Sequence, residues 1–389
     1  MRRKVKEMNL VEGTQTILWK VAQTPESGEM NPYAMDEDEQ CIIGQIEVIV
    51  RTLPIEKLVQ EAAQHLQADE LVAFPTETVY GLGANALSRR ALQHVFAAKN
   101  RPMDNPLIAH VSSLAQLDYL TPHVSSLVMR IMEEFWPGPL SILLPARKDL
   151  PQELTAGLDT VAVRMPQHPL TLAFIEAAGF PLAGPSANRS GRPSPTTAKH
   201  VLQDLAGKIS GVIDGGACSV GIESTVIEVL EQEIIILRPG EITRSNLAQY
   251  GVPVRYDEHL VQRREMTASP RSPGQKYRHY APQGELRIVT GYDSRVFNYV
   301  KDEISRAHTK GLRIATIGFP RDICIDADLI LSFGDRAIDM APHLYDSLRA
   351  SDEAVIDVIL ARGFRAAEET FAVMNRLLKA SGGIVIELY

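Results

Sequence analysis

The stretch from residue 71 to residue 111 alternates apolar runs with polar turns, a pattern that favours a mixed α/β fold. Its apolar run at 71–74 is typical of a short buried strand. Pro75 ends that strand, because proline cannot donate to a strand ladder. Helical spacing of apolar residues follows, and a second apolar run at 107–111 predicts the next strand. Ligands bind beyond strand ends in open α/β sheets, so the stretch also predicts the place of a site.

The rest of the chain predicts two domains joined by a linker. Between 46 and 250 the predicted strands outnumber the helices, which favours a twisted mixed sheet with helices, α+β in character. Between 284 and 389 strands and helices alternate, which predicts a smaller doubly wound, Rossmann-like α/β domain. Residues 251–283 have the composition of a linker, and the aromatic and basic residues His279 and Tyr280 fit either a lid over a site or a linker pinned to the surface. Residues 1–45 are polar and aperiodic, and we expect a disordered extension there.

Composition excludes several classes of protein. A net charge of −8 over 389 residues argues against a surface built mainly to coat nucleic acid or anionic lipid. The three cysteines, Cys41, Cys218 and Cys324, are far apart and lack zinc-site spacing, which predicts a reducing, cytoplasmic setting without disulfides. No apolar run reaches the roughly 20 residues that span a bilayer, so no membrane association is expected.

Cationic, hydroxyl and amide side chains recur where the predicted strands of the first domain end. Arginine forks and small hydroxyls suit a polyphosphate or a carboxylate. Any one of these residues alone would be an ordinary polar loop residue, but the whole set on an acidic chain favours a binding site. Our hypothesis is that Lys99 and Arg101 grip a phosphate-bearing ligand. The set comprises Thr76, Thr78, Lys99, Arg101, Arg164, Ser186, Asn188, Ser194, Ser224 and Arg238.

Two further signals leave alternatives open. His110 lies on an apolar strand, where a satisfied core histidine is more common than a ligand. The segment Gly81-Leu82-Gly83 weakly matches a dinucleotide-binding loop, but the turn before it is too long, and we interpret it as a chain reversal. A nicotinamide-dependent oxidoreductase is therefore one alternative. An RNA-binding module without catalysis is another, and it predicts an RNA affinity that salt weakens.

Several motifs of residues 50–389 resemble those of the YrdC-like family, specifically the long, two-domain threonylcarbamoyl-AMP synthases. The linker sequence SPGQKYRHYAP (272–282) resembles that of the long form, with Gln275 where methionine is expected. The matching motifs of the first domain are FPTETVYGLG (74–83), KNR (99–101), DNPL (104–107), PSAN (185–188), GIEST (221–225) and LRPG (237–240).

The resemblance implies an enzyme that converts L-threonine, bicarbonate and ATP into L-threonylcarbamoyladenylate and pyrophosphate. The product would feed the threonylcarbamoyladenosine modification of tRNA through a downstream transferase complex. Mg²⁺ would enter with the ATP phosphates, without a metal site on the protein. The oligomeric state stays open between monomer and homodimer.

The resemblance also implies roles for individual residues. Lys99, Arg101, Ser186 and Asn188 would be catalytic. The nucleotide would be bound by Lys99, Arg101, Asn105, Thr160, Ser186, Asn188, Ser194 and Arg238, with Tyr280 of the linker closing the site. Threonine would be held by Thr78, His110, Arg164 and Ser224, with Arg164 on its carboxylate.

Overall fold

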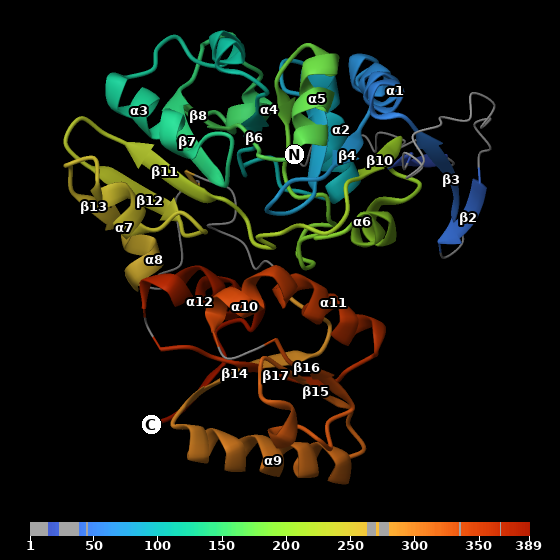
Figure 1. The fold of residues 1–389 in the computed structure, drawn as a ribbon, viewed down its shortest axis with the longest axis vertical. Coiled ribbons are helices and arrows are strands. Elements are labelled where there is room, and N and C mark those ends of the chain that lie inside the picture. The colour runs from blue at the N-terminus through green and yellow to red at the C-terminus, as the bar shows by residue number, and fades with distance from the viewer. Residues whose placement is uncertain are drawn as a thin grey trace, which may run out of the picture.

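The protein consists of two α/β units stacked end to end (Figure 1). The computed structural model describes residues 15–22, 39–43, 46–262, 270–271, 280–333, 336–365 and 367–389. The prediction of a mixed α/β first domain and a smaller, regularly wound second domain is confirmed. Among the described residues, no helix has the length and apolar character needed to cross a membrane.

The first unit is built on a 13-stranded mixed sheet, in the order β13-β12-β11-β7-β8-β6-β9-β5-β4-β10-β1-β3-β2. Its strands are β1 (Thr16–Val21), β2 (Glu39–Ile43), β3 (Ile46–Leu53), β4 (Val72–Phe74), β5 (Gly81–Asn85), β6 (Ile108–His110), β7 (Leu140–Pro145), β8 (Thr160–Arg164), β9 (Leu182–Ala183), β10 (Gly211–Asp214), β11 (Thr225–Val229), β12 (Ile234–Arg238) and β13 (Val254–Tyr256).

Helices and a 3₁₀ turn pack around this sheet. They are α1 (Ile55–Gln67), α2 (Arg89–Lys99), η1 (Leu114–Tyr119), α3 (Ser126–Phe135), α4 (Gln152–Thr155), α5 (Pro169–Ala178), α6 (Ala198–Leu205), α7 (Arg244–Ala248) and α8 (Glu258–Gln262). Helix α1 forms because its apolar residues Leu58, Val59, Ala62, Ala63 and Leu66 share one buried stripe.

Helix α2 is the element that delivers the basic loop to the site. Ser88 caps it by accepting a hydrogen bond from the backbone N–H of Ala91, which satisfies one of the free donors of the first turn. The helix ends where Asn100 adopts a left-handed conformation with φ of 52°. Lys99 is therefore the last helical residue, and Arg101 lies beyond the end in the following loop.

The second unit carries a parallel five-stranded sheet in the order β16-β15-β17-β14-β18. Helix α9 covers one face of that sheet, while α10, α11 and α12 lie between the sheet and the first unit (Figure 1). The elements are β14 (Glu285–Gly291), α9 (Asp293–Thr309), β15 (Ile314–Ile317), η2 (Arg321–Ile323), β16 (Leu329–Leu331), α10 (Ala337–Met340), η3 (Ala341–His343), α11 (Leu344–Glu353), β17 (Val358–Arg362), α12 (Glu368–Ala380) and β18 (Val385–Leu388).

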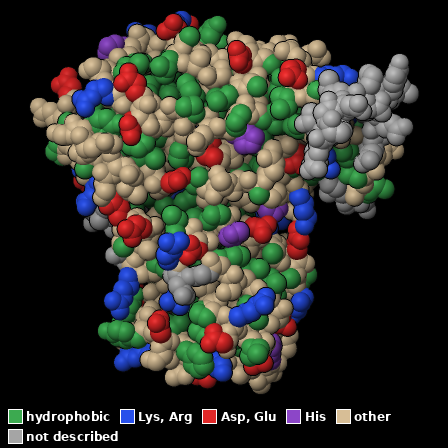
Figure 2. Space-filling model, in the orientation of Figure 1, with side chains coloured by type: hydrophobic (Ala, Val, Ile, Leu, Met, Phe, Trp, Pro, Cys, Tyr) green, Lys and Arg blue, Asp and Glu red, His purple; other side chains and the backbone are tan. Residues whose placement is uncertain are grey.

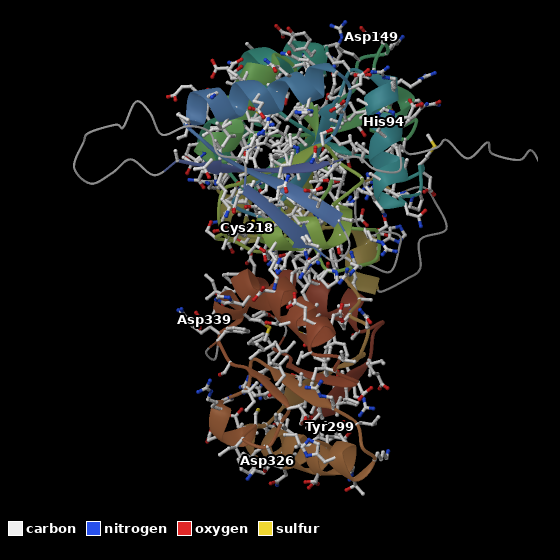
Figure 3. The ribbon with its side chains drawn as sticks, turned by 90° about the vertical axis from the view of Figure 1, so that its right-hand side faces the viewer. His94, Asp149, Cys218, Tyr299, Asp326 and Asp339 are labelled. Atoms are coloured by element: carbon white, nitrogen blue, oxygen red, sulfur yellow. The ribbon has the colours of Figure 1, made fainter. Side chains whose placement is uncertain are left out.

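The interface between the two units is a shared hydrophobic core. Val79 and Ile222 of the first unit and Tyr280 of the linker are buried in the same apolar cluster as Tyr345 and Leu348 of α11. Figure 3 places Cys218 at the base of the first unit, facing the second, whereas Tyr299 and Asp326 lie at the far end of the second unit. The cysteines Cys41, Cys218 and Cys324 are all free, as predicted.

The prediction that residues 1–45 form a disordered extension is wrong for two described segments. Strand β1 lies inside the sheet, parallel to both β10 and β3, and Trp19 on it is fully buried. The indole N–H of Trp19 donates to Glu61 over 3.0 Å. A strand buried on both faces is a short apolar run without alternation. Because polar residues surround this short run, the segment was interpreted as polar and aperiodic. Strand β2 extends the same sheet by pairing antiparallel with β3.

Two other sequence interpretations need correction. The predicted linker 251–283 begins inside the sheet, because β13 pairs with β12, and its residues 272–279 lie outside the described part of the chain. The segment Gly81–Gly83 is not the chain reversal itself but the start of β5, which runs antiparallel to β4. Glycine is required at 81 because a Cβ there would lie 2.5 Å from the ring of Phe74.

Candidate active site

A cavity lies where the loops of the first unit meet the end of the linker at Tyr280. It encloses about 740 Å³, open space at its mouth included. Most of the predicted site residues line it, although they come from segments scattered between residues 76 and 280. They are Thr76, Thr78, Lys99, Arg101, His110, Arg164, Ser186, Asn188, Ser194, Ser224, Arg238 and Tyr280. Asn105 and Thr160 are predicted site residues that do not line it.

Lys99 is buried and holds the loop at 186–188 in place through hydrogen bonds. Its buried ammonium donates to the backbone carbonyls of Ser186 and Asn188. The Ser186 hydroxyl in turn donates to the amide oxygen of Asn188 over 2.6 Å. Burial and the nearby Arg101 charge hold the pKa of Lys99 well below its usual range. The lysine therefore braces the 186–188 loop, whose residues Ser186 and Asn188 form part of the cavity wall.

Arg101 reaches the cavity from the loop after α2. Its guanidinium donates to the carbonyl oxygen of Pro106 over 3.0 Å and lies 3.4 Å from that of Asn105. Asn105 is buried and contributes to the site through this backbone contact rather than as part of the cavity wall. The short loop from 101 to 106 thus holds its own arginine in place.

Arg164, at the end of β8, lies at the centre of a buried polar group. Its Nη1 donates to Oγ1 of Thr78 over 2.7 Å, and its Nε donates to the carbonyl of Gly138 over 3.1 Å. Its Nη2 lies 2.7 Å from Oε1 of Glu77, a carboxylate that was not among the predicted site residues. The hydroxyls of Thr76 and Thr78 are 2.8 Å apart, which links the turn after β4 to this arginine.

His110 ends β6 and is both a core residue and part of the cavity wall. Burial and the charge of Arg164 lower its pKa to about 3, so the ring is neutral at physiological pH. The ring packs edge-on against Phe74, with centroids 5.4 Å apart. Gly184 permits this placement, because a Cβ there would lie 2.6 Å from Nδ1 of His110.

Ser224 and Arg238 bring two loops together. Arg238 donates through Nε to the carbonyl of Ser224 and through Nη2 to its hydroxyl, both over 3.0 Å. The Ser224 hydroxyl is also 2.8 Å from that of Ser141 on β7. Burial lowers the pKa of Arg238 from its ordinary value, and the side chain is 5% exposed.

Glu223 is a functional-site residue that sequence reasoning missed. It lines the cavity, and its Oε1 accepts a hydrogen bond from the Ser194 hydroxyl over 2.7 Å. Burial alone would raise the pKa of Glu223, but the charges of Arg376 and Arg238 lower it to about 2. The signal was its place beside Ser224 in the GIEST motif, but its partner Arg376 lies 153 residues away in the sequence.

Tyr280 places the end of the linker on the cavity wall. Its ring is 5.0 Å from that of Tyr345 in α11, and its backbone adopts φ of 67°. Burial, together with the charge of Glu223, raises the pKa of Tyr280 to about 12, so the phenol keeps its proton. The next residue, Ala281, donates its backbone N–H to the carbonyl of Gly191 over 3.0 Å.

Thr160 lies at the opposite end of β8 from Arg164, yet on the same face of the strand. Side chains alternate along a strand, so Thr160, Ala162 and Arg164 share one face. The core face carries Val161 and Val163 instead. A small apolar cluster occupies the face of Ala162, and its members are Ile108, Leu143, Ala162, Val226, Ile235 and Leu237.

The charge of the cavity favours an anionic ligand. Among the residues that line it, the cationic side chains are Lys99, Arg101, Arg164 and Arg238, and the carboxylate is Glu223. Buried arginine forks of this kind bind phosphate or carboxylate oxygens in pairs. Among the described residues, no group of three or more His, Cys, Asp or Glu side chains could hold a metal ion.

Comparisons with known proteins agree with this geometry. Residues 64–240 match the Sua5/YciO/YrdC family, described as "Telomere recombination", and residues 242–382 match the family described as "Threonylcarbamoyl-AMP synthase, C-terminal domain". The chain is 43% identical over 332 residues to the threonylcarbamoyl-AMP synthase of Bacillus subtilis, covering 84% of this chain and 94% of the relative. The chain belongs to the threonylcarbamoyl-AMP synthase family.

Other members of the threonylcarbamoyl-AMP synthase family support the same assignment. The relative from Pyrococcus abyssi is 43% identical over 327 residues, which are 84% of this chain and 95% of the relative. A crystal structure of P. abyssi Sua5 complexed with L-threonine superimposes with a TM-score of 0.81, at 42% identity and over 86% of this chain and 97% of that one. The two-domain fold is therefore that of Sua5 proteins.

The structure argues against both alternative functions, a nicotinamide-dependent oxidoreductase and an RNA-binding module. A dinucleotide-binding loop needs a turn from a strand into a helix, whereas Gly81–Gly83 lies in β5 of an antiparallel pair. On the face shown in Figure 2, basic and acidic side chains are interspersed rather than gathered into one basic patch. Together with the synthase relatives, this favours catalysis over an RNA-binding module.

Proposed function

We propose that this protein joins L-threonine, bicarbonate and ATP to form L-threonylcarbamoyladenylate and pyrophosphate. The observation that carries the proposal is the meeting of four cationic side chains, small buried hydroxyls and a neutral histidine in one cavity of a threonylcarbamoyl-AMP synthase family member. Cations suit a triphosphate and a carboxylate together, and the hydroxyls suit the polar groups of an amino acid.

Threonine would occupy the end of the cavity around Arg164. The guanidinium of Arg164 would bind the threonine carboxylate, sharing its charge between that group and Glu77. Thr78 and Ser224 contribute hydroxyls to the wall of the same cavity. His110 stays neutral beside it, so it can accept a hydrogen bond without adding a positive charge that would repel the substrate amine.

ATP would extend from the basic end of the cavity along the sheet. Arg101, Arg238 and the Ser186–Asn188 loop braced by Lys99 would surround its phosphates. The apolar face around Ala162 would receive the base, and Thr160 lies on that face at the far end of β8. Mg²⁺ would arrive as part of the substrate, bound to the ATP phosphates, where it offsets their negative charge.

The chemistry needs positioning and positive charge more than a nucleophilic side chain. The threonine amine combines with bicarbonate to give a carbamate and water. A carbamate oxygen then attacks the α-phosphorus of ATP, and pyrophosphate leaves in line. Arg101 and Arg238 would offset charge on the phosphate oxygens, and holding the reactants at contact distance supplies much of the rate. A carbamate is short-lived in water, so closure of the linker at Tyr280 would protect it.

The product would be consumed by the transferase complex that makes threonylcarbamoyladenosine in tRNA. A mixed anhydride of a carbamic acid and AMP is an activated acyl donor, so a carbamoyl-transferring partner is the class of enzyme that would use it. The cytoplasmic location and the choice between monomer and homodimer stay predictions from the sequence.

Incubation of the purified protein with ATP, Mg²⁺ and bicarbonate, with and without L-threonine, tests the proposal. We expect pyrophosphate release and a new adenylate, detected by mass spectrometry, only when threonine is present. L-Serine is the informative comparison, because it lacks only a methyl group, a difference worth about 1–3 kcal/mol in a fitted pocket. A rate of pyrophosphate release that changes with neither L-threonine nor L-serine would contradict the proposal. Salt-sensitive RNA binding without turnover would contradict it as well.

A further inference from the structure

We propose that Arg376 and Tyr345 of the second domain are positioning residues for the active site and act through Glu223. The inference deepens the proposed function and rests on it. It gives the second domain a defined part in the reaction: it holds together two loops of the first domain that carry ligand-binding side chains. Neither Arg376 nor Tyr345 lines the cavity.

The guanidinium of Arg376 contacts both loops at once. Its Nε donates to Oε2 of Glu223 over 3.0 Å, and its Nη2 donates to the backbone carbonyl of Glu223 over 3.2 Å. Its Nη1 donates to the backbone carbonyl of Pro239. Arg376 is 1% exposed, so all three contacts are made away from bulk water. A planar fork can bind acceptors in several directions at fixed geometry, which an ammonium group cannot do.

The two loops that Arg376 joins are those that carry Ser224 and Arg238. Ser224 follows Glu223 directly, and Arg238 precedes Pro239 directly. These two neighbours bond to each other, from Arg238 Nε to the Ser224 carbonyl over 3.0 Å. The second domain therefore fixes the spacing between a proposed threonine ligand and a proposed nucleotide ligand.

The carboxylate of Glu223 also holds a third loop, the one that carries Ser194. Its Oε1 accepts the hydroxyl hydrogen bond of Ser194 over 2.7 Å, while Tyr345 donates to its Oε2 over 2.8 Å. With both of these donors and Arg376 in place, the carboxylate has one orientation, and the Ser194 hydroxyl points at it. Losing Arg376 would leave the carboxylate buried without its ion-pair partner and held only by the hydroxyls of Ser194 and Tyr345.

The docking of the two domains is close enough to transmit this position. Gly221 adopts φ of 72°, and a Cβ there would lie 2.4 Å from Cα of Pro342 in η3. Ile222, the residue between Gly221 and Glu223, is buried in the core of the second domain. The GIEST loop (221–225) is thus held by backbone approach, apolar burial and the Arg376 ion pair together.

The test compares Arg376→Gln with Glu368→Ala in the full-length protein. Glu368 lies on the same helix, α12, and also makes an interdomain contact, to the Ser245 hydroxyl over 2.7 Å, but it touches neither loop. We expect Arg376→Gln to raise KM for both threonine and ATP and to lower kcat/KM by about tenfold or more. Glu368→Ala should leave KM for threonine, KM for ATP and kcat/KM near the values of the parent protein. Arg376→Lys should not restore activity, because lysine lacks the planar fork.

The split between KM and kcat separates positioning from simple loss of folded protein. A variant that merely unfolds in part loses active molecules, so its apparent kcat falls at unchanged KM. That result, or kinetics within twofold of the parent in a folded Arg376→Gln protein, would overturn the inference. If Arg376→Gln does not fold, Tyr345→Phe tests the inference instead, because it keeps the aromatic ring and removes one hydrogen-bond donor to Glu223. A severalfold rise in both KM values supports the inference, and unchanged kinetics refute it. An inactive parent protein would refute the proposed function instead.

Discussion

Thr78 and Arg164 meet through a hydrogen bond of 2.7 Å, although 86 residues separate them in the sequence. Thr78 comes from the turn after β4, and Arg164 from the end of β8. Both residues line the cavity, and the Glu77 carboxylate balances the guanidinium charge of Arg164.

Replacement of Arg164 by lysine should weaken threonine binding selectively. Lysine keeps the charge but loses the fork that reaches Thr78, Gly138 and a carboxylate together. We expect KM for threonine to rise by about tenfold or more, with a much smaller change in KM for ATP. Arg147→Lys is the matched control, since Arg147 is a surface residue paired with Asp149. An equal rise in both KM values would remove Arg164 from the threonine site.

Replacement of Lys99 by methionine should abolish turnover while the protein stays folded at low temperature. The change leaves the buried carbonyls of Ser186 and Asn188 without their donor, at about 1–3 kcal/mol for each unpaired group. Thermal unfolding and steady-state rates measure the two effects separately. Full turnover in this variant would show that the 186–188 loop needs no lysine.

The lowered pKa of Lys99 also predicts a pH effect on the reaction. Burial disfavours the charged amine, so the pKa lies well below its usual range and the charge is lost as pH rises through that lower value. We expect kcat/KM to fall on the alkaline side at a pH below the titration of an ordinary lysine. Replacing Lys99 by arginine, which stays charged throughout, should move that decline in any residual activity to higher pH.

His110 predicts how stability depends on pH. Its pKa falls from 6.5 in the unfolded chain to about 3 in the folded protein, so below pH 6.5 the unfolded state binds a proton that the folded state does not. The stability that the neutral ring contributes is present above pH 6.5 and is lost as pH falls toward 3. Lowering the pH from 7 to 5 should cost about 2 kcal/mol of unfolding free energy.

Denaturant unfolding at several pH values checks this, with His110→Gln as the comparison. The slope between pH 6.5 and 5 should be flatter in the variant, because glutamine does not titrate. The lowered pKa of Glu223 acts in the same direction but at lower pH, as pH falls from 4.5 toward about 2. Identical slopes in both proteins above pH 5 would show that His110 is not the group responsible.

Thr160 tests the extent of the nucleotide site. If the base lies on the apolar face around Ala162, Thr160→Val should raise KM for ATP about threefold and leave KM for threonine unchanged. Valine matches threonine in shape and replaces its hydroxyl by a methyl group. Unchanged kinetics for both substrates would confine the nucleotide to the cavity itself.

The candidate site was largely predictable because its residues follow strand ends. Arg164 and Arg238 end strands β8 and β12, and Ser186 follows β9, whereas Lys99 ends helix α2. The ends of neighbouring strands meet at one edge of a sheet. Residue type and position together were therefore sufficient to collect them. Motifs such as PSAN and GIEST then assigned individual roles.

The residues that escaped prediction depend on contacts between distant parts of the chain. Glu223 became recognisable only through Arg376 and Tyr345, which a local pattern cannot connect to it. Strand β1 escaped for a related reason: its partner β10 lies near residue 212, and no turn nearby marks the pairing. Neither long-range pairing leaves a period or a turn signal in the sequence.

The shared core at the interdomain contact has a consequence for how this protein can change over evolution. Val79 and Ile222 of the first domain fill the interior of the second, and Gly221 leaves no room against Pro342 for even a methyl group. A chimera that took its second domain from a distant homologue would have gaps or clashes along this interdomain interface, the seam between the domains. It would also leave the buried Glu223 carboxylate without its ion-pair partner. The seam, rather than the linker, determines which halves can be recombined, and the two must be inherited as a matched pair.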